Sequence, residues 1–510
     1  MQIGRYELLT DKPEVNYENI IQILQEVFPM HQVNAMRINY LLGYEAGNQP
    51  LQRAKTYRSD IDCKCVDNVA HEIAKFHIGY KWGVPITVIQ RGEKDSGNDK
   101  EVSAISLLNE QYEMQQIRKK TQKLARFVEI CGVGYTFVDI NSDYEDGESL
   151  FNIEALDART TFVVRSSYYY DRRVMISGTY RTDSKGNNYF TCFTNNERFE
   201  ILNLTKIMNG KKVVEEEKWQ HVERSGEINP LGINPIIEWI RNDDRMGCFE
   251  RQISDLDNLN LLISDFTNDV EQNTQAIWHG NDIEFPVERI TNEDGTITER
   301  VKKPGTNEWV ITSTPQDGKT PFIKPLAVEY DYQGMLNNIV TRRALILQKC
   351  NVPQRNDNSG GSTGIAMDSA TGWSAAEAQA QKQQNIMESC KMEEIKVVLS
   401  AIKNNPYLPS DSPLLGLKYS DIQPNIKRSK TYELTVKTNA LTTLLSHGFD
   451  LRDAAQAIPM FEDNTQVIER SGEGVKKYQD SQVFKSEKQT EEKRPFADAS
   501  DQISNSPNIN

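Results

Sequence analysis

A run of about thirty residues without glycine or proline, Phe249 to Trp278, places the strongest limit on how this chain can fold. Apolar residues recur in it at intervals of three and four, namely at Ile253, Leu256, Leu259, Ile263, Phe266 and Val270. That spacing predicts one long amphipathic helix. At a rise of about 1.5 Å per residue the helix would reach roughly 45 Å, longer than most globular helices need to be. The fold must therefore accommodate a rod.

A second helical pattern, Tyr330 to Cys350, follows after an interruption. The interruption, Asn281 to Val328, mixes glycine and proline with strand-forming residues, so it predicts a small β-rich insertion. Because an insertion between two helices lies at their far end, this order predicts a helical hairpin with a small tip. The polar face of the first helix carries carboxylates that include Asp265 and Asp269, and such a face taken alone indicates a solvated surface.

The residues before the long helix mix two patterns. Apolar spacing predicts a helix over Asn16 to Val27, which Pro29 should end. Further helices are predicted over Ser59 to Lys81 and over Ser103 to Ile130. Short β-branched and aromatic runs separated by turn residues then continue to about Trp239. The mixture predicts the α+β fold class.

The residues after the second helix change character twice. Pro353 to Gly372 is rich in Asn, Ser and Gly and predicts a loop. Ser374, with Glu377 three residues later, forms a capping-box pattern and predicts the start of a helix that continues to about Asn404. From about Gly474 the chain is polar and charged with few apolar residues, which is typical of disordered tails.

Charge and composition restrict the function classes. The net charge of −14, from 59 basic and 73 acidic residues, has the wrong sign for a protein that grips phosphates over a broad surface. An acidic protein can still work beside DNA if it lets the polymer slide past. No apolar run approaches the length of a membrane helix, and no secretory signal is visible. Seven scattered cysteines indicate reduced thiols, so we expect a soluble, cytosolic chain with no membrane contact.

Short catalytic signatures are weak or broken. Gly318-Lys319-Thr320 lacks the upstream glycine of a phosphate-binding loop. His71 and His77 are six apart, which rotates them away from each other on a helix. Cys63 and Cys65 are two apart on a predicted helix and should also point apart. We therefore expect no catalytic residues, no metal and no cofactor. The alternative is an enzyme that acts on nucleic acid through scattered carboxylates.

Several short sequence motifs, taken in order along the chain, match those of one protein family. They are Tyr40-Leu41-Leu42-Gly43, Gly79-Tyr80 with Gly83-Val84-Pro85-Ile86, Asp157-Ala158-Arg159 before Phe162-Val163-Val164, and Gly361-Ser362-Thr363-Gly364-Ile365-Ala366. Over roughly residues 15 to 470 the chain resembles the portal proteins of tailed double-stranded-DNA bacteriophages, in the branch typical of long non-contractile tails. Ala158 stands where that family has proline, and Thr363 where serine is usual.

The resemblance implies the phage portal fold. Its parts would be a wing over 1–248, a first stem helix over 249–278, a small β-containing clip over 279–329, a second stem helix over 330–352, a tunnel loop region over 353–373, a kinked helix and helical crown over 374–473, and a disordered polar tail over 474–510.

The resemblance also implies a function and partners. Such a chain is one subunit of a ring of about twelve copies at one capsid vertex, assembled in the host cytoplasm and carried in the virion. DNA enters and leaves the capsid through the ring. The implied partners are further copies of the chain, the terminase large subunit, a head–tail adaptor, the major capsid or scaffolding protein, and double-stranded DNA in transit.

Three groups of site residues follow from the resemblance. The DNA channel and tunnel loop would use Asp357, Asn358, Ser359, Gly360, Gly361, Ser362, Thr363 and Gly364. Candidates for channel-wall or phosphate contacts are Asp265, Asp269, Arg342, Arg343 and Lys349, with outward salt bridges as the alternative for the three cations. Glu299 and Lys302 are candidates for contact with partners of the clip. The sequence leaves open which face of the stem helices lines the channel.

Overall fold

A computed structural model describes most of the chain before residue 450. The described residues are 4–52, 61–91, 99–145, 147–204, 207–208, 211–212, 218–274, 278–281, 287–292, 294–301, 322–325, 331–354, 372–428, 434–449 and 454.

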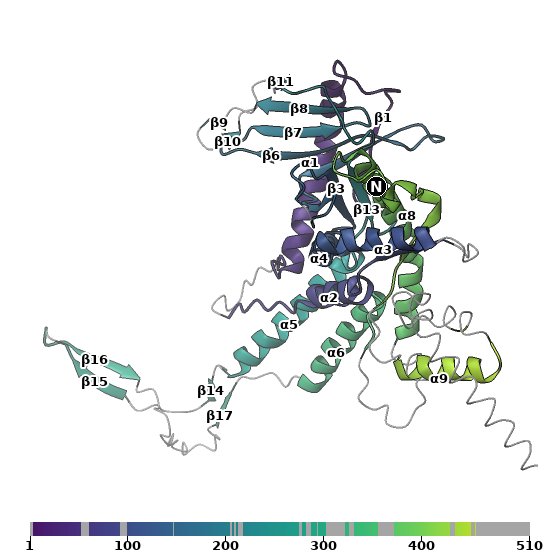
Figure 1. Cartoon of the computed structure of the whole chain (residues 1–510). Helices are drawn as coiled ribbons and strands as arrows, with labels where there is room; N and C mark the ends of the chain where they lie inside the picture. Colours follow the sequence, from purple (N-terminus) through teal and green to yellow (C-terminus); the bar gives the residue numbers. More distant parts are fainter. Residues whose placement is uncertain are drawn as a thin grey trace, which may run out of the picture.

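A seven-stranded sheet forms one end of the molecule, at the top of Figure 1. Its order is β1 (Leu8–Thr10), β5 (Thr161–Ser166), β6 (Val174–Thr182), β7 (Asn188–Phe193), β8 (Glu197–Leu204) and β11 (Lys218–His221), with β12 (Glu227–Ile228) also on β8. Only the β1–β5 pair is parallel in this sheet. Helix α1 (Ile20–Glu45) packs on the sheet and shares a core with Phe162 and Phe190.

Helix α1 does not end before Pro29, which is a correction to the predicted helix over Asn16 to Val27. Pro29 lies inside the helix. Beyond it, Ile38, Leu41 and Tyr44 are buried in a second core. Proline removes one backbone hydrogen bond and crowds the preceding turn. Burial of the side chains beyond it outweighs that loss.

A three-stranded sheet forms the centre, in the order β13 (Ile236–Ile240), β3 (Val133–Ile140), β4 (Phe151–Leu156). Helices α4 (Ile117–Cys131) and α8 (Trp373–Asn404) contact it. The remaining described elements of the body are α2 (Val69–Trp82), β2 (Thr87–Gln90), α3 (Asp99–Met114), β9 (Ile207–Met208), β10 (Lys211–Lys212), β18 (Ile422–Asn425) and α9 (Leu434–Ser446), with two short 3-10 turns at Pro413–Gly416 and Tyr419–Asp421.

The single helix predicted over Ser103 to Ile130 is in fact two helices. The chain breaks between α3 and α4, where Gln116 adopts a left-handed backbone with φ 52°. At the other end of α4, Gly132 has φ 77°, and a Cβ there would lie 2.4 Å from the carbonyl carbon of Arg245. Glycine therefore lets the end of α4 meet the segment that enters the long helix.

The helix predicted over Ser59 to Lys81 is also shorter than expected. Residues 61–68 are not helical, and α2 begins after Asn68, whose side chain accepts a hydrogen bond from the His71 N–H at 3.3 Å. The next subsection gives the reason, which is that another helix binds the backbone of 61–67.

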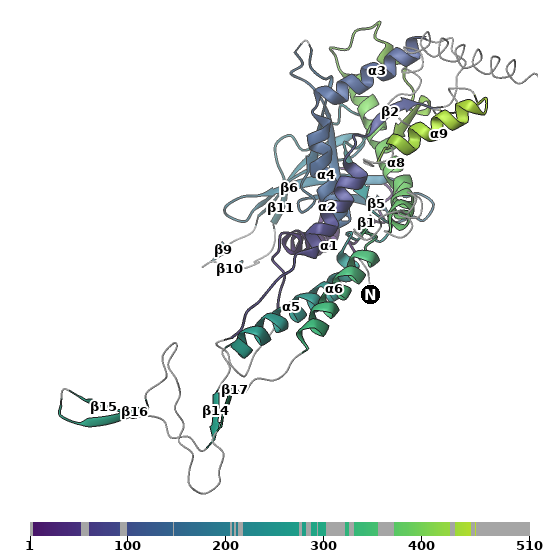
Figure 2. The same cartoon turned by 90° about the horizontal axis from the view of Figure 1, so that it is seen from below.

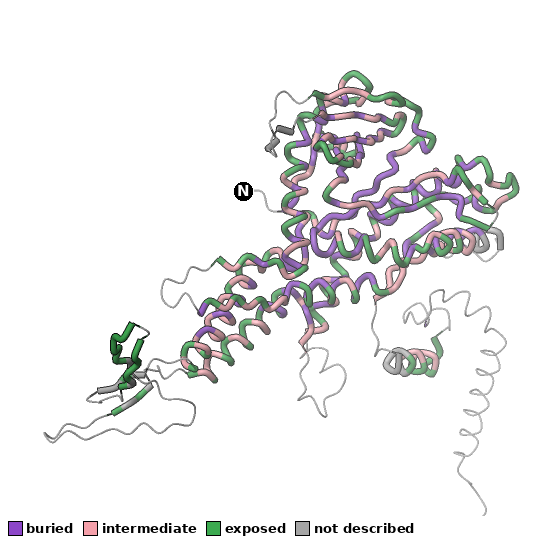
Figure 3. Tube along the Cα trace, turned by 90° about the vertical axis from the view of Figure 1, so that its left-hand side faces the viewer, coloured by how far each residue is buried: buried purple, intermediate pink, exposed green. Residues whose placement is uncertain are grey.

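Two helices project from the body, α5 (Ile253–Thr274) after a 3-10 turn (Glu250–Gln252), and α6 (Tyr332–Lys349) (Figures 1 and 2). Beyond their far ends lie two antiparallel strand pairs. These are β14 (Trp278–Asn281) with β17 (Phe322–Pro325), and β15 (Val287–Thr291) with β16 (Ile297–Val301). Buried residues concentrate in the body, whereas β15 and β16 are exposed where they are described (Figure 3).

Helix α8 begins at Trp373 with Gly372 (φ 86°) as its N-cap, so Ser374 lies one residue inside the helix and does not cap it. Glu377 accepts hydrogen bonds from the Tyr80 hydroxyl and, at 2.7 Å, from Arg428 Nη1. The α+β class is confirmed. In the part of the chain described, none of the helices combines the length and apolar character that spanning a membrane requires.

Candidate functional site

Helices α5 and α6 form an antiparallel pair. Near the body, Lys349 Nζ at the end of α6 lies 2.6 Å from Asp255 Oδ2 at the start of α5. At the far end, Asn273 donates a hydrogen bond to the Tyr332 hydroxyl, and Tyr332 packs edge-on against Phe266 with ring centroids 6.0 Å apart. The predicted helical hairpin is therefore present, and its two helices are tied at both ends.

An extended segment runs along α5, and we call residues 61–67 the strap. The Cys63 N–H donates to Asn268 Oδ1 at 2.7 Å, and Asn268 Nδ2 donates to the Cys63 carbonyl oxygen at 3.1 Å. The Cys65 N–H donates to Ser264 Oγ at 3.0 Å. The Asp67 N–H, at the end of the strap, donates to Asn260 Oδ1 at 2.9 Å. The side chains of a helix thus take the place of a neighbouring strand.

The spacing of these contacts explains why they fit. Asn260, Ser264 and Asn268 are four residues apart, so they form one stripe along α5, and each is at most 1 % exposed. Four helical residues rise about 6.0 Å. Two residues of an extended chain span about 6.6 Å and present their backbone groups to the same edge. Every second strap residue therefore meets every fourth helix residue.

Helix α6 also contacts the strap, through an ion pair. Arg343 Nε lies 3.0 Å from Asp67 Oδ2 at the end of the strap, and the same guanidinium bonds Glu72 on α2. Asn260 Nδ2 donates to Gln49 Oε1, and Gln49 Nε2 donates to Asn68 Oδ1 at 2.9 Å. The strap is therefore fixed to both helices of the pair and to the body.

A buried carboxylate joins four elements inside the body. Glu129 on α4 is fully buried and accepts hydrogen bonds from four side chains: Lys81 Nζ at 3.2 Å, Trp82 Nε1 at 3.0 Å, Arg241 Nε at 2.9 Å and Gln383 Nε2 at 2.8 Å. Burial alone would raise the pKa of Glu129, but Lys81 and Arg241 hold that pKa well below its ordinary value. Burial lowers the pKa of Lys81 to about 8. The carboxylate therefore stays ionised inside the protein.

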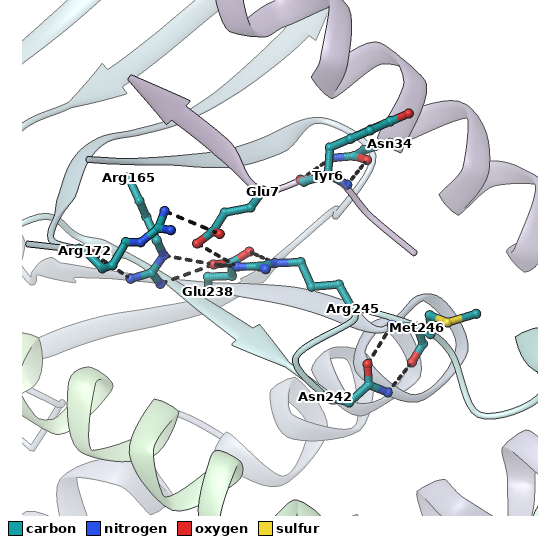
Figure 4. Close-up of polar contacts among 9 residues, drawn as sticks. All are labelled: Tyr6, Glu7, Asn34, Arg165, Arg172, Glu238, Asn242, Arg245 and Met246. Atoms are coloured by element: carbon teal, nitrogen blue, oxygen red, sulfur yellow. Dashed lines mark hydrogen bonds and ion pairs between the residues drawn. The ribbon is translucent and has the colours of Figure 1, made fainter. Parts of the chain in front are cut away.

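A second ion cluster lies just before α5 (Figure 4). Glu238 on β13 lies 3.2 Å from both Arg165 Nη2 and Arg245 Nε, and Arg245 also lies 3.5 Å from Glu7. Burial would raise the pKa of Glu238, yet the two guanidinium groups lower it. The loop after β13 is closed by the Asn242 side chain, which exchanges two hydrogen bonds of 3.0 Å with the backbone of Met246. The entry to the long helix is thus set rigidly.

The predicted site residues on α5 and α6 differ in burial and in their contacts. Asp265 and Asp269 are half-buried on α5. Arg343 and Lys349 are both in ion pairs, whereas Arg342 is exposed and its Nε donates to Asn338 Oδ1 at 3.0 Å.

At the tip, Glu299 on β16 is exposed and lies 3.0 Å from Arg289 Nε on β15. Lys302 and the predicted tunnel loop, Asp357 to Gly364, lie outside the described residues.

No chemistry-bearing cluster emerges in the region that the structure describes. Among those residues no group of three His, Cys, Asp or Glu side chains lies close enough to hold a metal. His77 is buried and its Nε2 lies 2.9 Å from the Cys350 carbonyl oxygen, and burial holds its pKa well below the ordinary value. Burial raises the pKa of the Cys248 thiol to about 12. Neither group is poised for proton transfer or nucleophilic attack at neutral pH.

Sequence reasoning missed the stripe on α5. Asn260, Ser264 and Asn268 are short polar residues at a spacing of four inside an otherwise amphipathic helix. That spacing was visible, because a polar stripe beside the apolar one indicates a second buried contact. What it contacts was not visible, since the partner is backbone and carries no residue-type signal.

The fold and the site define a class of protein: an α+β chain with a projecting helical hairpin tied at both ends. In the residues described, the chain shows no catalytic cluster. The family model for phage portal proteins, described as SPP1 Gp6-like, matches residues 37–491. The chain belongs to this family, and the predicted resemblance is confirmed. A comparison with curated proteins finds no match.

Proposed function

We propose that the chain is one subunit of a closed ring of about twelve copies that forms the channel for DNA entry into and exit from the phage capsid. Membership of the portal family carries this proposal. The projecting pair of helices supports it, because a ring of such pairs encloses a bore. The family is structural, and we infer no enzymatic activity.

We assign the parts of the portal as wing 1–248, stem helices 249–278 and 330–352, clip 279–329, tunnel loop region 353–373, and kinked helix with crown 374–473. In this arrangement the tips of α5 and α6 carry the clip outward to the terminase large subunit and later to the head–tail adaptor. The wing and crown face the major capsid or scaffolding protein. The ring is assembled in the host cytoplasm and remains at the portal vertex of the virion.

We further propose that the acidic face of α5, with Asp265 and Asp269, lines the channel. Like charge there would discourage DNA from sticking to the wall. The ion pairs of Arg343 and Lys349 favour structural salt bridges over phosphate contacts for these two residues. Arg342 is exposed and is the better candidate for a sparse phosphate contact.

Native mass spectrometry of the purified chain tests the ring, together with class-averaged electron micrographs. We expect a closed ring of about twelve copies with a central pore. Monomer alone at micromolar concentration across several salt concentrations would overturn the proposal. Magnesium-dependent cleavage of DNA by such a monomer would instead support an enzyme that works through scattered carboxylates.

A further inference from the structure

The two cysteines of the strap lie side by side. Cys63 Sγ and Cys65 Sγ are 3.6 Å apart, and both residues are half-buried. The prediction that they point apart is wrong, because it assumed a helix. In an extended chain, residues two apart share a face. Four of the other five cysteines are buried.

The extended backbone must contract before these sulfurs can form a covalent bond. Residues two apart in an extended chain have Cα atoms about 6.6 Å apart. Disulfides span Cα separations of roughly 4.4 to 6.8 Å. A disulfide also needs its two Cβ atoms within about 4.5 Å, whereas those of residues two apart in an extended chain lie about 6.6 Å apart, so the strap must contract by about 2 Å. Such a contraction takes the strap out of register with the rise of about 6.0 Å between Ser264 and Asn268 on α5, so the hydrogen bonds to both side chains cannot persist together.

We propose that Cys63 and Cys65 are a redox-active dithiol, which small-molecule disulfides oxidise to a disulfide within the strap, and that this oxidation loosens the strap from α5. The inference concerns one chain and does not depend on ring assembly. Its setting rests on the proposed function, since a virion assembled in a reducing cytoplasm is released into an oxidising medium.

The chemistry balances as thiol–disulfide exchange. The thiolate of one cysteine attacks a sulfur of the small-molecule disulfide, which forms a mixed disulfide and releases one small thiol. The thiolate of the second cysteine then displaces the remaining small thiol. Two protein thiols become one disulfide, the reagent disulfide becomes two thiols, and two electrons pass from the protein to the reagent. Thr267 Oγ1 on α5 lies 3.6 Å from Cys65 Sγ in the reduced strap.

Looser binding follows from geometry. The disulfide holds Cys63 and Cys65 closer together than their partners Asn268 and Ser264 on α5 allow, so hydrogen bonds to one of these partners are lost. Lys64, between the two cysteines, provides the readout because its side chain is 49 % exposed. Trypsin cleaves a folded protein mainly through local opening. Cleavage after Lys64 therefore measures how often the strap leaves α5.

The experiment treats the full chain with oxidised glutathione at pH 8.5 and a matched sample with a phosphine reductant. We expect complete digests of the oxidised sample to contain the two peptides that end at and follow Lys64 joined by a disulfide. Limited digestion of the folded protein should cut after Lys64 roughly tenfold faster when oxidised, as judged on reducing gels, because the loss of a hydrogen bond favours local opening of the strap.

Two variants serve as controls. Cys63→Ser should form only a glutathione adduct at Cys65, with no faster cleavage beyond that caused by the adduct. Cys131→Ser removes a buried thiol elsewhere and should oxidise as the wild type does. Stable glutathione adducts at both strap cysteines of the wild type would overturn the proposal, as would persistence of both thiols. A disulfide that leaves cleavage at Lys64 unchanged or slower would overturn the loosening.

Discussion

Glu129 shows how a single residue can depend on its whole environment. It is fully buried and ionised because cations from α2 and from the end of β13 surround it. A buried pair of this kind adds little net stability over apolar packing, yet removing one partner leaves uncompensated charge. The same carboxylate joins α4 to α8 through Gln383. Its role is therefore to fix how these elements meet.

Glu129→Gln should lower the free energy of unfolding by about 3 to 5 kcal/mol, because Lys81 and Arg241 lose their counter-charge in a dry site. Urea titration at pH 7 measures this loss. Glu154→Gln is the matched control, since its pair with Lys120 is partly exposed at 3.0 Å and should contribute less than about 1 kcal/mol. Equal effects of the two substitutions would contradict the assigned role.

The same variant should change the response to acid. The folded protein holds the pKa of Glu129 below its ordinary value of 4.5, so this group contributes stability above pH 4.5 that is lost as the pH falls. The stability of wild type should therefore decline more steeply between pH 5 and pH 3 than that of Glu129→Gln.

Among single residues, the sequence could not predict which side chains pair. Broken motifs such as Gly318 to Thr320 led to the expectation of no catalytic site, and that expectation stays a prediction. The partners of Arg343 and Lys349 were not predictable, because Asp67 and Asp255 are distant in sequence from them. Long-range pairing depends on the fold and leaves no local pattern.

At the scale of elements, the strap is held by side chains that serve as a partner strand. Asn268→Ala should remove two hydrogen bonds and leave the Cys63 backbone groups unpaired, at a cost of about 1 to 3 kcal/mol that falls on the strap alone. Hydrogen exchange should become faster for amides of residues 61–67 and stay unchanged in the central sheet. Asn258→Ala, on the exposed side of α5, is the control and should leave strap exchange as in wild type.

The tip of the hairpin offers a charge-swap test of the clip. Glu299→Lys should weaken docking of the terminase large subunit or the head–tail adaptor while rings still form. The double variant Arg289→Glu with Glu299→Lys restores the ion pair across β15 and β16, so it controls for damage to the strands themselves. Binding measured by co-sedimentation should stay weak in the double variant. Full recovery there would show that only strand integrity matters.

The sequence predicted helices where apolar spacing was regular, as in α5, α6 and α8. The helix predicted over Phe249 to Trp278 is shorter, because Glu250–Gln252 forms a 3-10 turn and Trp278 pairs in strand β14. The other errors share a cause. Pro29 inside α1, the break at Gln116 and the extended residues 61–68 all reflect tertiary contacts that override local preference. The N-cap of α8 lies at Gly372, two residues before the predicted Ser374, and Glu377 bonds Tyr80 and Arg428 instead of the cap.

At the scale of the whole molecule, the proposal is a ring whose bore is narrowest at the loop between α6 and α8. Deletion of Ser359 to Thr363 should leave ring assembly intact but reduce the length of packaged DNA or the fraction of DNA retained. The reason is that the polar, glycine-rich loop would contact the moving duplex there. An in vitro packaging assay with nuclease protection measures this. A five-residue deletion within the tail 474–510 is the matched control. Normal packaging and retention by the loop deletion would reduce the loop to a connector.

The strap gives the projecting pair an unequal response to mechanical load. Its hydrogen bonds to Asn260, Ser264 and Asn268 lie across the helix axis, so a pull along that axis loads all three in shear together. A sideways pull at one end loads these hydrogen bonds one after another, so each can break separately. In the proposed ring, where the pair would run along the channel, a DNA motor would exert force mainly along the helices. The strap would then resist that force with all three contacts together and yield most readily when the tip of the pair is bent outward.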